Sequence, residues 1–142
     1  MLTKQDILIA QNNWCLAIID KDVDALLALY DFGTSEKPLL FKPTLAGDIR
    51  TTYRGAKAYF VGNDHLFPFD KGFLNNNWTD IVFKSAVGPV PKAGDKGFKD
   101  MGHYIFTNDH SSVHADYTFT YHEVDGEAKI TLHHSSLTWT PV

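Results

Sequence analysis

The sequence predicts an α+β fold in which N-terminal helices pack on one face of a strongly curved, mostly antiparallel sheet. Three observations predict it. Apolar residues recur at helical spacing in the first 31 residues, and strand-like segments rich in Val, Ile, Thr, Tyr and Phe fill the second half. A two-residue turn, Asp125-Gly126, joins the last two of these segments as a hairpin.

The first helix is expected to begin after Thr3, because Thr3 and Asp6 match a capping box with Asp in place of the usual Glu. The charged run at 20–22 interrupts the helical pattern. A second short helix is therefore expected over 23–30, with Gly33 ending it. The apolar side of the first helix is formed by Ile7, Ala10, Trp14, Ala17 and Ile18.

The middle of the chain contains a short strand at 39–41 and a third helix over 52–60, capped by Thr51 or Thr52. An irregular stretch, rich in aromatic residues, Gly and Asn, follows over 61–77. The second half is expected to hold four strands, at 78–87, 98–107, 113–123 and 127–139, with a flexible connector over 88–97.

Composition predicts a single domain spanning 1–142, since 142 residues with 44% apolar content can bury a sizeable core. The formal charge of −4 and the presence of only two arginines, Arg50 and Arg54, argue against a nucleic-acid partner. Cys15 stands alone, so no internal disulfide can form. No membrane span or signal-peptide core is evident, and a cytoplasmic location is expected. No metal site and no cofactor are predicted.

The Asp125-Gly126 turn predicts the register of the last hairpin. If those two residues form the loop, Tyr121 faces Ile130, Phe119 faces Leu132 and Tyr117 faces His134. Opposed residues of an antiparallel pair point to the same side, so this face is apolar except for His134. Two interpretations remain open for that residue: a hydrogen-bonded core histidine, or a functional group in a pocket.

A weaker turn at 108–111 places Gly102 opposite Tyr117 and Tyr104 opposite Ala115. Glycine leaves side-chain volume empty, so space for a pocket is expected beside Gly102. The candidate pocket-lining residues are His134, Tyr117, Tyr104, Gly102, Arg50 and Trp14.

The outer face of the sheet is expected to carry several histidines, including His133, with His103 opposite Asp116. His133 and His134 would point to opposite faces, so they cannot share a metal ion. Candidate oligomer-interface residues on this face are His103, Asp116, Thr118, His133, Leu137 and Trp139.

Two stretches carry a family resemblance: Leu-Leu-Phe-Lys-Pro-Thr-Leu at 39–45, and Ala-Asp-Tyr-Thr-Phe-Thr-Tyr at 115–121 followed by Ile-Thr-Leu-His-His-Ser-Ser at 130–136. Together they resemble the association (hub) domain of calcium/calmodulin-dependent protein kinase II. That family lies within the nuclear transport factor 2-like (SnoaL-like) superfamily, which also holds polyketide cyclases and ketosteroid isomerases. The resemblance implies a cone-shaped, cystatin-like fold with a pocket under the N-terminal helix. It also implies calmodulin-linked biology and oligomers, as dimers or rings of dimers.

Two functions are weighed on this basis. The favoured one is an oligomeric hub-like scaffold without kinase activity, whose pocket takes a small organic ligand. Hub pockets carry arginines that hold a carboxylate, whereas the matching strand positions here are Phe119 and Ser135, and Asp116 replaces an Arg common among relatives. The alternative is an isomerase or cyclase that uses His134 as acid or base, with Tyr117 or Tyr104 as a donor. Neither nucleic acid nor membrane is expected as a partner.

Overall fold

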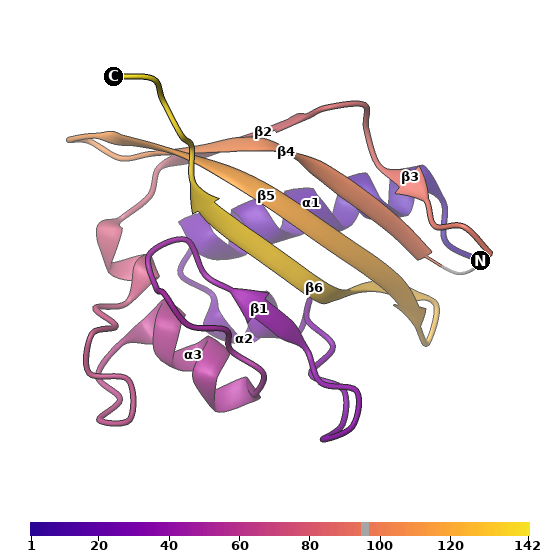
Figure 1. Cartoon of the computed structure of the whole chain (residues 1–142), viewed down its shortest axis with the longest axis horizontal. Coiled ribbons are helices and arrows are strands. Elements are labelled where there is room, and N and C mark those ends of the chain that lie inside the picture. Colours follow the sequence, from indigo (N-terminus) through magenta and orange to yellow (C-terminus); the bar gives the residue numbers. More distant parts are fainter. Residues whose placement is uncertain (95–96) are drawn as a thin grey trace.

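A curved sheet with a long helix across one face forms the body of the protein (Figure 1). The computed structural model describes residues 1–94 and 97–142. Within these residues the six-stranded sheet has the order β1-β6-β5-β4-β2, with β3 paired to β4. The helices are α1 (Lys4–Ile19), α2 (Val23–Leu27), α3 (Tyr53–Val61) and the 3₁₀ helix η1 (Phe73–Asn76). The strands are β1 (Leu40–Lys42), β2 (Asp80–Ser85), β3 (Val90–Pro91), β4 (Gly97–Thr107), β5 (Ser112–Val124) and β6 (Glu127–Leu137).

The predicted capping box of α1 is present. The Asp6 backbone N–H donates to Thr3 Oγ1 at 3.2 Å, and the Thr3 N–H donates to the Asp6 carboxylate at 2.8 Å. The second helix ends at Leu27, earlier than expected, because Tyr30 pairs with the sheet at Ile130. None of the helices in the described part of the chain is long and apolar enough to cross a membrane.

The predicted α+β class and its strands are confirmed, with trimmed ends. The strand expected at 39–41 is β1, which runs parallel to β6. In the connector expected over 88–97, Val90–Pro91 form β3 against β4, and residues 95 and 96 lie outside the described residues.

The register of β4 and β5 is as predicted, with Gly102 opposite Tyr117 and Tyr104 opposite Ala115. The space expected beside Gly102 is filled. A Cβ atom there would lie 2.2 Å from the carbonyl oxygen of Lys84 on β2. Glycine at this position therefore permits close approach of the β2 backbone and does not open a pocket.

The register of β5 and β6 departs from the prediction through a β-bulge. Tyr121 pairs with Ile130 as expected, but Thr120 then pairs with Leu132, so Thr131 is the extra residue. The bulge lies where Ile130 turns its backbone to the segment after α2: its N–H donates to Leu29 and its carbonyl accepts from Asp31, each at 2.8 Å.

The bulge reverses the two faces of β6 beyond Thr131. His133 is buried, with 2% of its surface exposed, and pairs with Phe119. His134 is exposed and pairs with Thr118. The predicted inward position of His134 and the predicted outward position of His133 are therefore both wrong, because the turn-derived register does not continue through the bulge.

Candidate functional site

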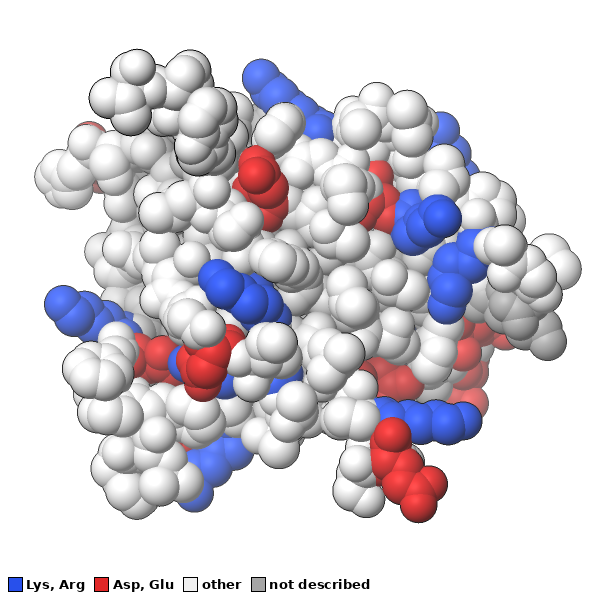
Figure 2. Space-filling view, viewed as in Figure 1, with Lys and Arg blue, Asp and Glu red and all other residues white. Residues whose placement is uncertain are grey.

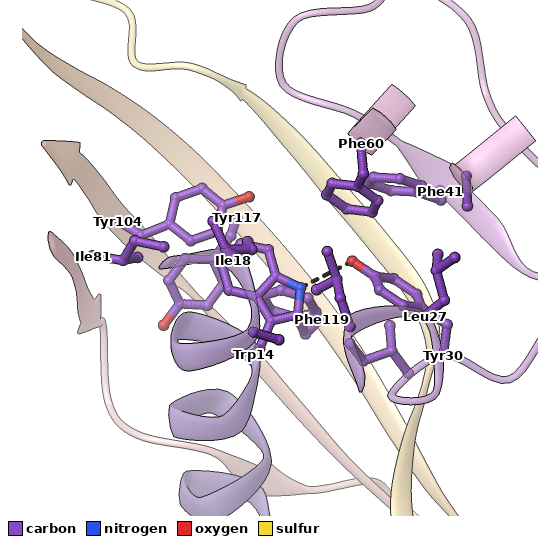
Figure 3. Close-up of a cluster of buried hydrophobic side chains, with 14 of the residues drawn as sticks. Trp14, Ile18, Leu27, Tyr30, Phe41, Phe60, Ile81, Tyr104, Tyr117 and Phe119 are labelled. Atoms are coloured by element: carbon purple, nitrogen blue, oxygen red, sulfur yellow. Dashed lines mark hydrogen bonds between the residues drawn. The ribbon is translucent and has the colours of Figure 1, made fainter. Parts of the chain in front are cut away.

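Three of the candidate pocket residues lie in the interior between α1 and the sheet. Trp14, Tyr104 and Tyr117 are each at most 2% exposed. Figure 3 shows the Trp14 ring projecting from α1 among aromatic side chains of the strands. The Trp14 ring stacks on Tyr104, with ring centroids 5.7 Å apart and ring planes at 6°. These side chains build the wall behind a polar cluster centred on His133.

The imidazole of His133 is held between two aromatic rings. The ring of Phe119 lies 4.0 Å away on one side and that of Phe41 lies 4.9 Å away on the other, both nearly parallel to the imidazole. Both ring nitrogens have hydroxyl partners, with Nδ1 2.9 Å from Tyr30 and Nε2 3.0 Å from Tyr104. The imidazole is thus fixed in position and orientation.

Trp14 sets the direction of these hydrogen bonds. Its indole N–H can only donate, and it donates to the Tyr30 hydroxyl oxygen at 3.0 Å, the dashed line in Figure 3. The Tyr30 O–H must then donate to Nδ1 of His133, its remaining partner among the described residues. Nε2 consequently carries the proton and donates to the Tyr104 oxygen.

Beyond Tyr104 the network ends in small hydroxyl groups. Ser135 is fully buried, two residues along β6 from His133, and its hydroxyl hydrogen-bonds that of Thr44. Burial raises the pKa of Tyr104, and the hydroxyls of Ser135 and Thr44 oppose that rise. The Tyr59 hydroxyl of α3 accepts the backbone N–H of Leu45 at 3.2 Å and also interacts with Thr44.

The titration behaviour of this cluster follows from its burial. Burial lowers the pKa of His133 well below its usual value, and the neighbouring His134 lowers it further. Burial likewise raises the pKa of Tyr30 and Tyr59 above the usual range. At neutral pH the cluster is therefore a row of uncharged, oriented dipoles.

Thr44 and Tyr59 were not predicted as site residues, and Ser135 was named only as a position that matches a hub-pocket arginine. The signal for Ser135 is its spacing of two from His133, which puts both on one face of a strand. That signal is ambiguous, because His134 and Ser136 have the same spacing on the opposite face. Thr44 and Tyr59 come from a loop and from α3, whose approach to β6 has no local sequence signature.

Arg50 is buried as predicted, but its guanidinium binds Asp70 and does not line a pocket beside Tyr104 and Tyr117. Its guanidinium donates to both oxygens of Asp70, at 2.7 and 2.8 Å, and to the Gly55 carbonyl at 2.8 Å. Its Nε donates to Asp48, and the ring of Phe67 lies 4.4 Å from its central carbon. Arg50 therefore ties the loop after β1 to the loop after α3, close to Tyr59.

A second buried polar cluster surrounds Asp100, which the sequence analysis did not identify. Its carboxylate, on β4, is 3% exposed and accepts hydrogen bonds from Gln11 at 2.7 Å, Tyr117 at 2.9 Å and Ser85. The Tyr117 hydroxyl is thus engaged with Asp100 and not with His133.

Of the candidate interface residues, His103, Asp116 and Thr118 lie on the outer face. The bulge turns Leu137, opposite Ala115, to the same side of β6 as His133, at the exposed end of the strand, and Trp139 lies beyond β6. His103 Nδ1 is 2.7 Å from the Asp116 carboxylate, as the register predicts. Thr118 is half-buried beside His134, and Leu137 and Trp139 are 58% and 80% exposed. Their role in an interface remains a prediction.

The site is chemically a set of hydroxyl and imidazole groups in an aromatic box. In residues 1–94 and 97–142, no three His, Cys, Asp or Glu side chains are grouped so that they could hold a metal ion. The fold is nuclear transport factor 2-like, since structural neighbours are described as NTF-2 like and as having a cystatin-like fold, and its interior holds this uncharged polar cluster. This fold was predicted from the sequence and is confirmed.

Comparison with known families is more specific. The chain belongs to the metal-independent carbonic anhydrase family, whose model matches residues 5–137. It is 33% identical over 159 residues to a metal-independent carbonic anhydrase of Nostoc sp. strain PCC 7120, covering 96% of this chain and 74% of that protein. It also resembles the crystal structure of a cyanobacterial iota-carbonic anhydrase complexed with bicarbonate, with 33% identity and a TM-score of 0.82 over 99% of this chain and 94% of the other.

The resemblance to kinase hubs holds at the level of fold alone. A putative calcium/calmodulin-dependent protein kinase II association domain from Xanthomonas campestris is 24% identical, with a TM-score of 0.71 over 94% of this chain and 86% of that one. The expectation of a calmodulin-linked hub scaffold is wrong, and so is the isomerase or cyclase alternative. Both are overturned by the match to a carbonic anhydrase family.

Proposed function

We propose that this chain catalyses the reversible hydration of CO₂ to bicarbonate in the His133 cluster. The observation that carries the proposal is the directed row of hydrogen bonds from Trp14 through Tyr30 and His133 to Tyr104, together with the buried Thr44–Ser135 hydroxyl pair on the same side of β6 as His133. Family membership and the bicarbonate bound by a 33% identical relative support it.

The cluster suits both sides of this reaction. CO₂ is small and uncharged, and the aromatic walls formed by Phe41 and Phe119 accept an uncharged molecule without a desolvation penalty. Bicarbonate has three oxygens that need donors. The hydroxyls of Thr44, Tyr104 and Ser135 can each accept from a neutral water or rotate to donate to an anion.

Catalysis would come from stabilising charge as it develops. A lone pair of the water oxygen attacks the carbon of CO₂, a C–O bond forms, and one C=O π pair moves onto oxygen while the water releases a proton. Hydroxyl dipoles fixed around this oxygen stabilise the negative charge without having to reorient against bulk water. Removing one such donor typically costs about 10²–10³ in kcat.

His133 acts in this scheme as a donor that positions Tyr104. Its Nδ1 is occupied by Tyr30, so Nε2–H donates to the Tyr104 oxygen and fixes the position of that hydroxyl. Because its pKa is lowered, His133 stays neutral at neutral pH and does not hold a second proton on its ring. The proton released by hydration must therefore leave for solvent or buffer.

Adjacent residues of β6 supply a matched test. His133→Gln and Ser135→Ala change the buried face, whereas His134→Gln and Ser136→Ala make the same changes on the outer face. Oxygen-18 exchange between CO₂ and water, measured on protein treated with a chelator, reports the activity. We expect a loss of about 100-fold or more for the inner variants and near-unchanged activity for the outer ones. Equal activity in the inner variants and the wild type would overturn the proposal.

We also propose that the chain self-associates through the outer face of its sheet. Figure 2 shows this face of the protein, on which charged side chains are scattered among uncharged ones. Exposed apolar residues lie there on neighbouring strands, including Val82 on β2 and Met101 on β4. The single-domain organisation and the cytoplasmic location expected from the sequence remain predictions.

A further inference from the structure

The proposed catalytic cluster has almost no contact with solvent, so its substrate needs a route. His133 is 2% exposed, and Tyr104 and Ser135 are fully buried. Tyr59 differs from them in its surroundings, because it also lines a pocket of 260 Å³ that opens to the surface. A water molecule occupies about 30 Å³ in the liquid, so this pocket has room for several small molecules.

The floor of the pocket is the outer edge of the cluster itself. Leu45 lines the pocket, and its backbone N–H donates to the Tyr59 hydroxyl. The preceding residue, Thr44, hydrogen-bonds Ser135 inside the protein. A single residue step along the chain therefore separates the solvent-facing pocket from the buried hydroxyl groups.

The far wall of the pocket, residues 69–73, is held in place. Phe73 stacks on Tyr59, with ring centroids 5.4 Å apart. Gly72 has a φ of +86°, and a Cβ atom on it would lie 2.6 Å from the Val61 carbonyl oxygen, so only glycine allows this approach. Asp70 is fixed by the two-pronged contact with Arg50. The rim of the opening is thus held by ring stacking, a glycine close approach and an ion pair.

The charge at the mouth favours a small anion. Asp70 lines the pocket, and both its oxygens accept from Arg50, which also pairs with Asp48 outside the pocket lining. Lys71 also lines the pocket and forms no ion pair with the residues that the structure describes. Lys71 therefore presents its own positive charge at the mouth, which attracts a monovalent anion and is indifferent to an uncharged gas.

We propose that the pocket bounded by Leu45, Tyr59 and residues 69–73 is the port through which CO₂ enters and bicarbonate leaves, and that Lys71 favours the anion at its mouth. This inference rests on the proposed carbonic anhydrase function. It adds a route and a selectivity residue to that function.

Reversible plugging of the pocket tests the port. Leu45→Cys is made in a Cys15→Ala background and treated with methyl or benzyl methanethiosulfonate, which attach groups of different size to the thiol. The control is Leu16→Cys in the same background, since Leu16 is 48% exposed on α1 and Leu45 is 50% exposed. Oxygen-18 exchange gives kcat/KM before labelling, after labelling and after reduction with dithiothreitol.

We expect the benzyl group at position 45 to lower kcat/KM about tenfold or more. A tenfold loss corresponds to about 1.4 kcal/mol of activation free energy. The methyl group should have a smaller effect, dithiothreitol should restore activity, and the labelled control should be unchanged. Full activity of the benzyl-labelled protein would overturn the port while leaving the catalytic function intact. Absence of activity in the unlabelled wild type would overturn the catalytic function, and the port with it.

The charge at the mouth is tested separately. Lys71→Gln is compared with Lys57→Gln, an exposed lysine of α3 that does not line this pocket. We expect Lys71→Gln to raise the KM for bicarbonate about two- to fivefold at low ionic strength, with the difference disappearing in about 0.5 M salt. An unchanged KM at low salt would remove Lys71 from the proposal.

Discussion

Burial of a neutral histidine makes the stability of this protein sensitive to mild acid. His133 is 2% exposed, lies between two phenylalanine rings, and has a pKa lowered well below its usual value, chiefly by burial. In the unfolded chain the same imidazole is in water and titrates at about 6.5. Below that pH the unfolded state binds a proton that the folded state does not, so acid favours unfolding.

The size of the effect follows from that difference. Stability is fully retained above about pH 6.5 and falls by about 1.4 kcal/mol for each pH unit below it, until the pH reaches the lowered pKa of the folded state. Between pH 7 and pH 5 the contribution of His133 is therefore at most about 2 kcal/mol. A domain of this size is commonly stable by about 5–15 kcal/mol, so the loss is a substantial share.

Urea denaturation at pH 7, 6 and 5, followed by far-UV circular dichroism, measures this loss. The pH dependence of His133→Gln is subtracted from that of the wild type, because the six other histidines and all carboxylates are common to both proteins. His134→Gln serves as the exposed control and should retain the wild-type slope. If His133→Gln lost stability between pH 7 and pH 5 as steeply as the wild type, the buried neutral state of His133 would be refuted. ¹⁵N NMR of the wild-type imidazole checks independently for the Nε2–H tautomer.

Three further predictions concern other parts of the structure. Trp14→Phe removes the N–H that donates to Tyr30; we expect a loss of about 2–4 kcal/mol in the free energy of unfolding, and a mixture of His133 tautomers by ¹⁵N NMR. Asp100→Asn places an amide N–H₂ among groups that already donate, which should cost about 1–3 kcal/mol in urea denaturation, whereas the same change at the exposed Asp109 should cost almost nothing. Self-association should appear in light scattering at micromolar concentration as a mass above 16.0 kDa, and Met101→Lys on the outer face should reduce it; a wild-type monomer would contradict this surface as an interface.

Most of the fold could be predicted from the sequence because its signals are local. The Thr3–Asp6 capping box, the charged break at 20–22 and the Asp125-Gly126 turn each act over a few residues, and each appears where expected. The second helix was overextended because its apolar spacing continues to Tyr30. Tyr30 fits that spacing because its side chain is buried against the sheet, where its backbone forms a β-bridge with Ile130 and not a helical turn.

The site could not be predicted to the same degree because it depends on one long-range event. A hairpin register read from its turn holds only while the strands remain regular, and here the backbone of Ile130 is diverted to Leu29 and Asp31. Those partners are about 100 residues away in the chain, so the hairpin sequence contains no trace of them. Thr131 has no feature that marks it as a bulge residue.

The bulge at Thr131 determines which residues of the run His-His-Ser-Ser at 133–136 face the interior. Because the pair His133 and Ser135 is repeated one residue later as His134 and Ser136, either register puts a histidine and a serine inside. Only the bulged register brings the inner histidine level with Tyr30 and Tyr104, and the inner serine level with Thr44. The segments that carried the resemblance to kinase hubs therefore contain the site's own residues, Thr44 in the first and His133 and Ser135 in the last. A resemblance built on strands identified the fold correctly. Which histidine and which serine form the proposed site depends on the face of β6 that the bulge turns inward.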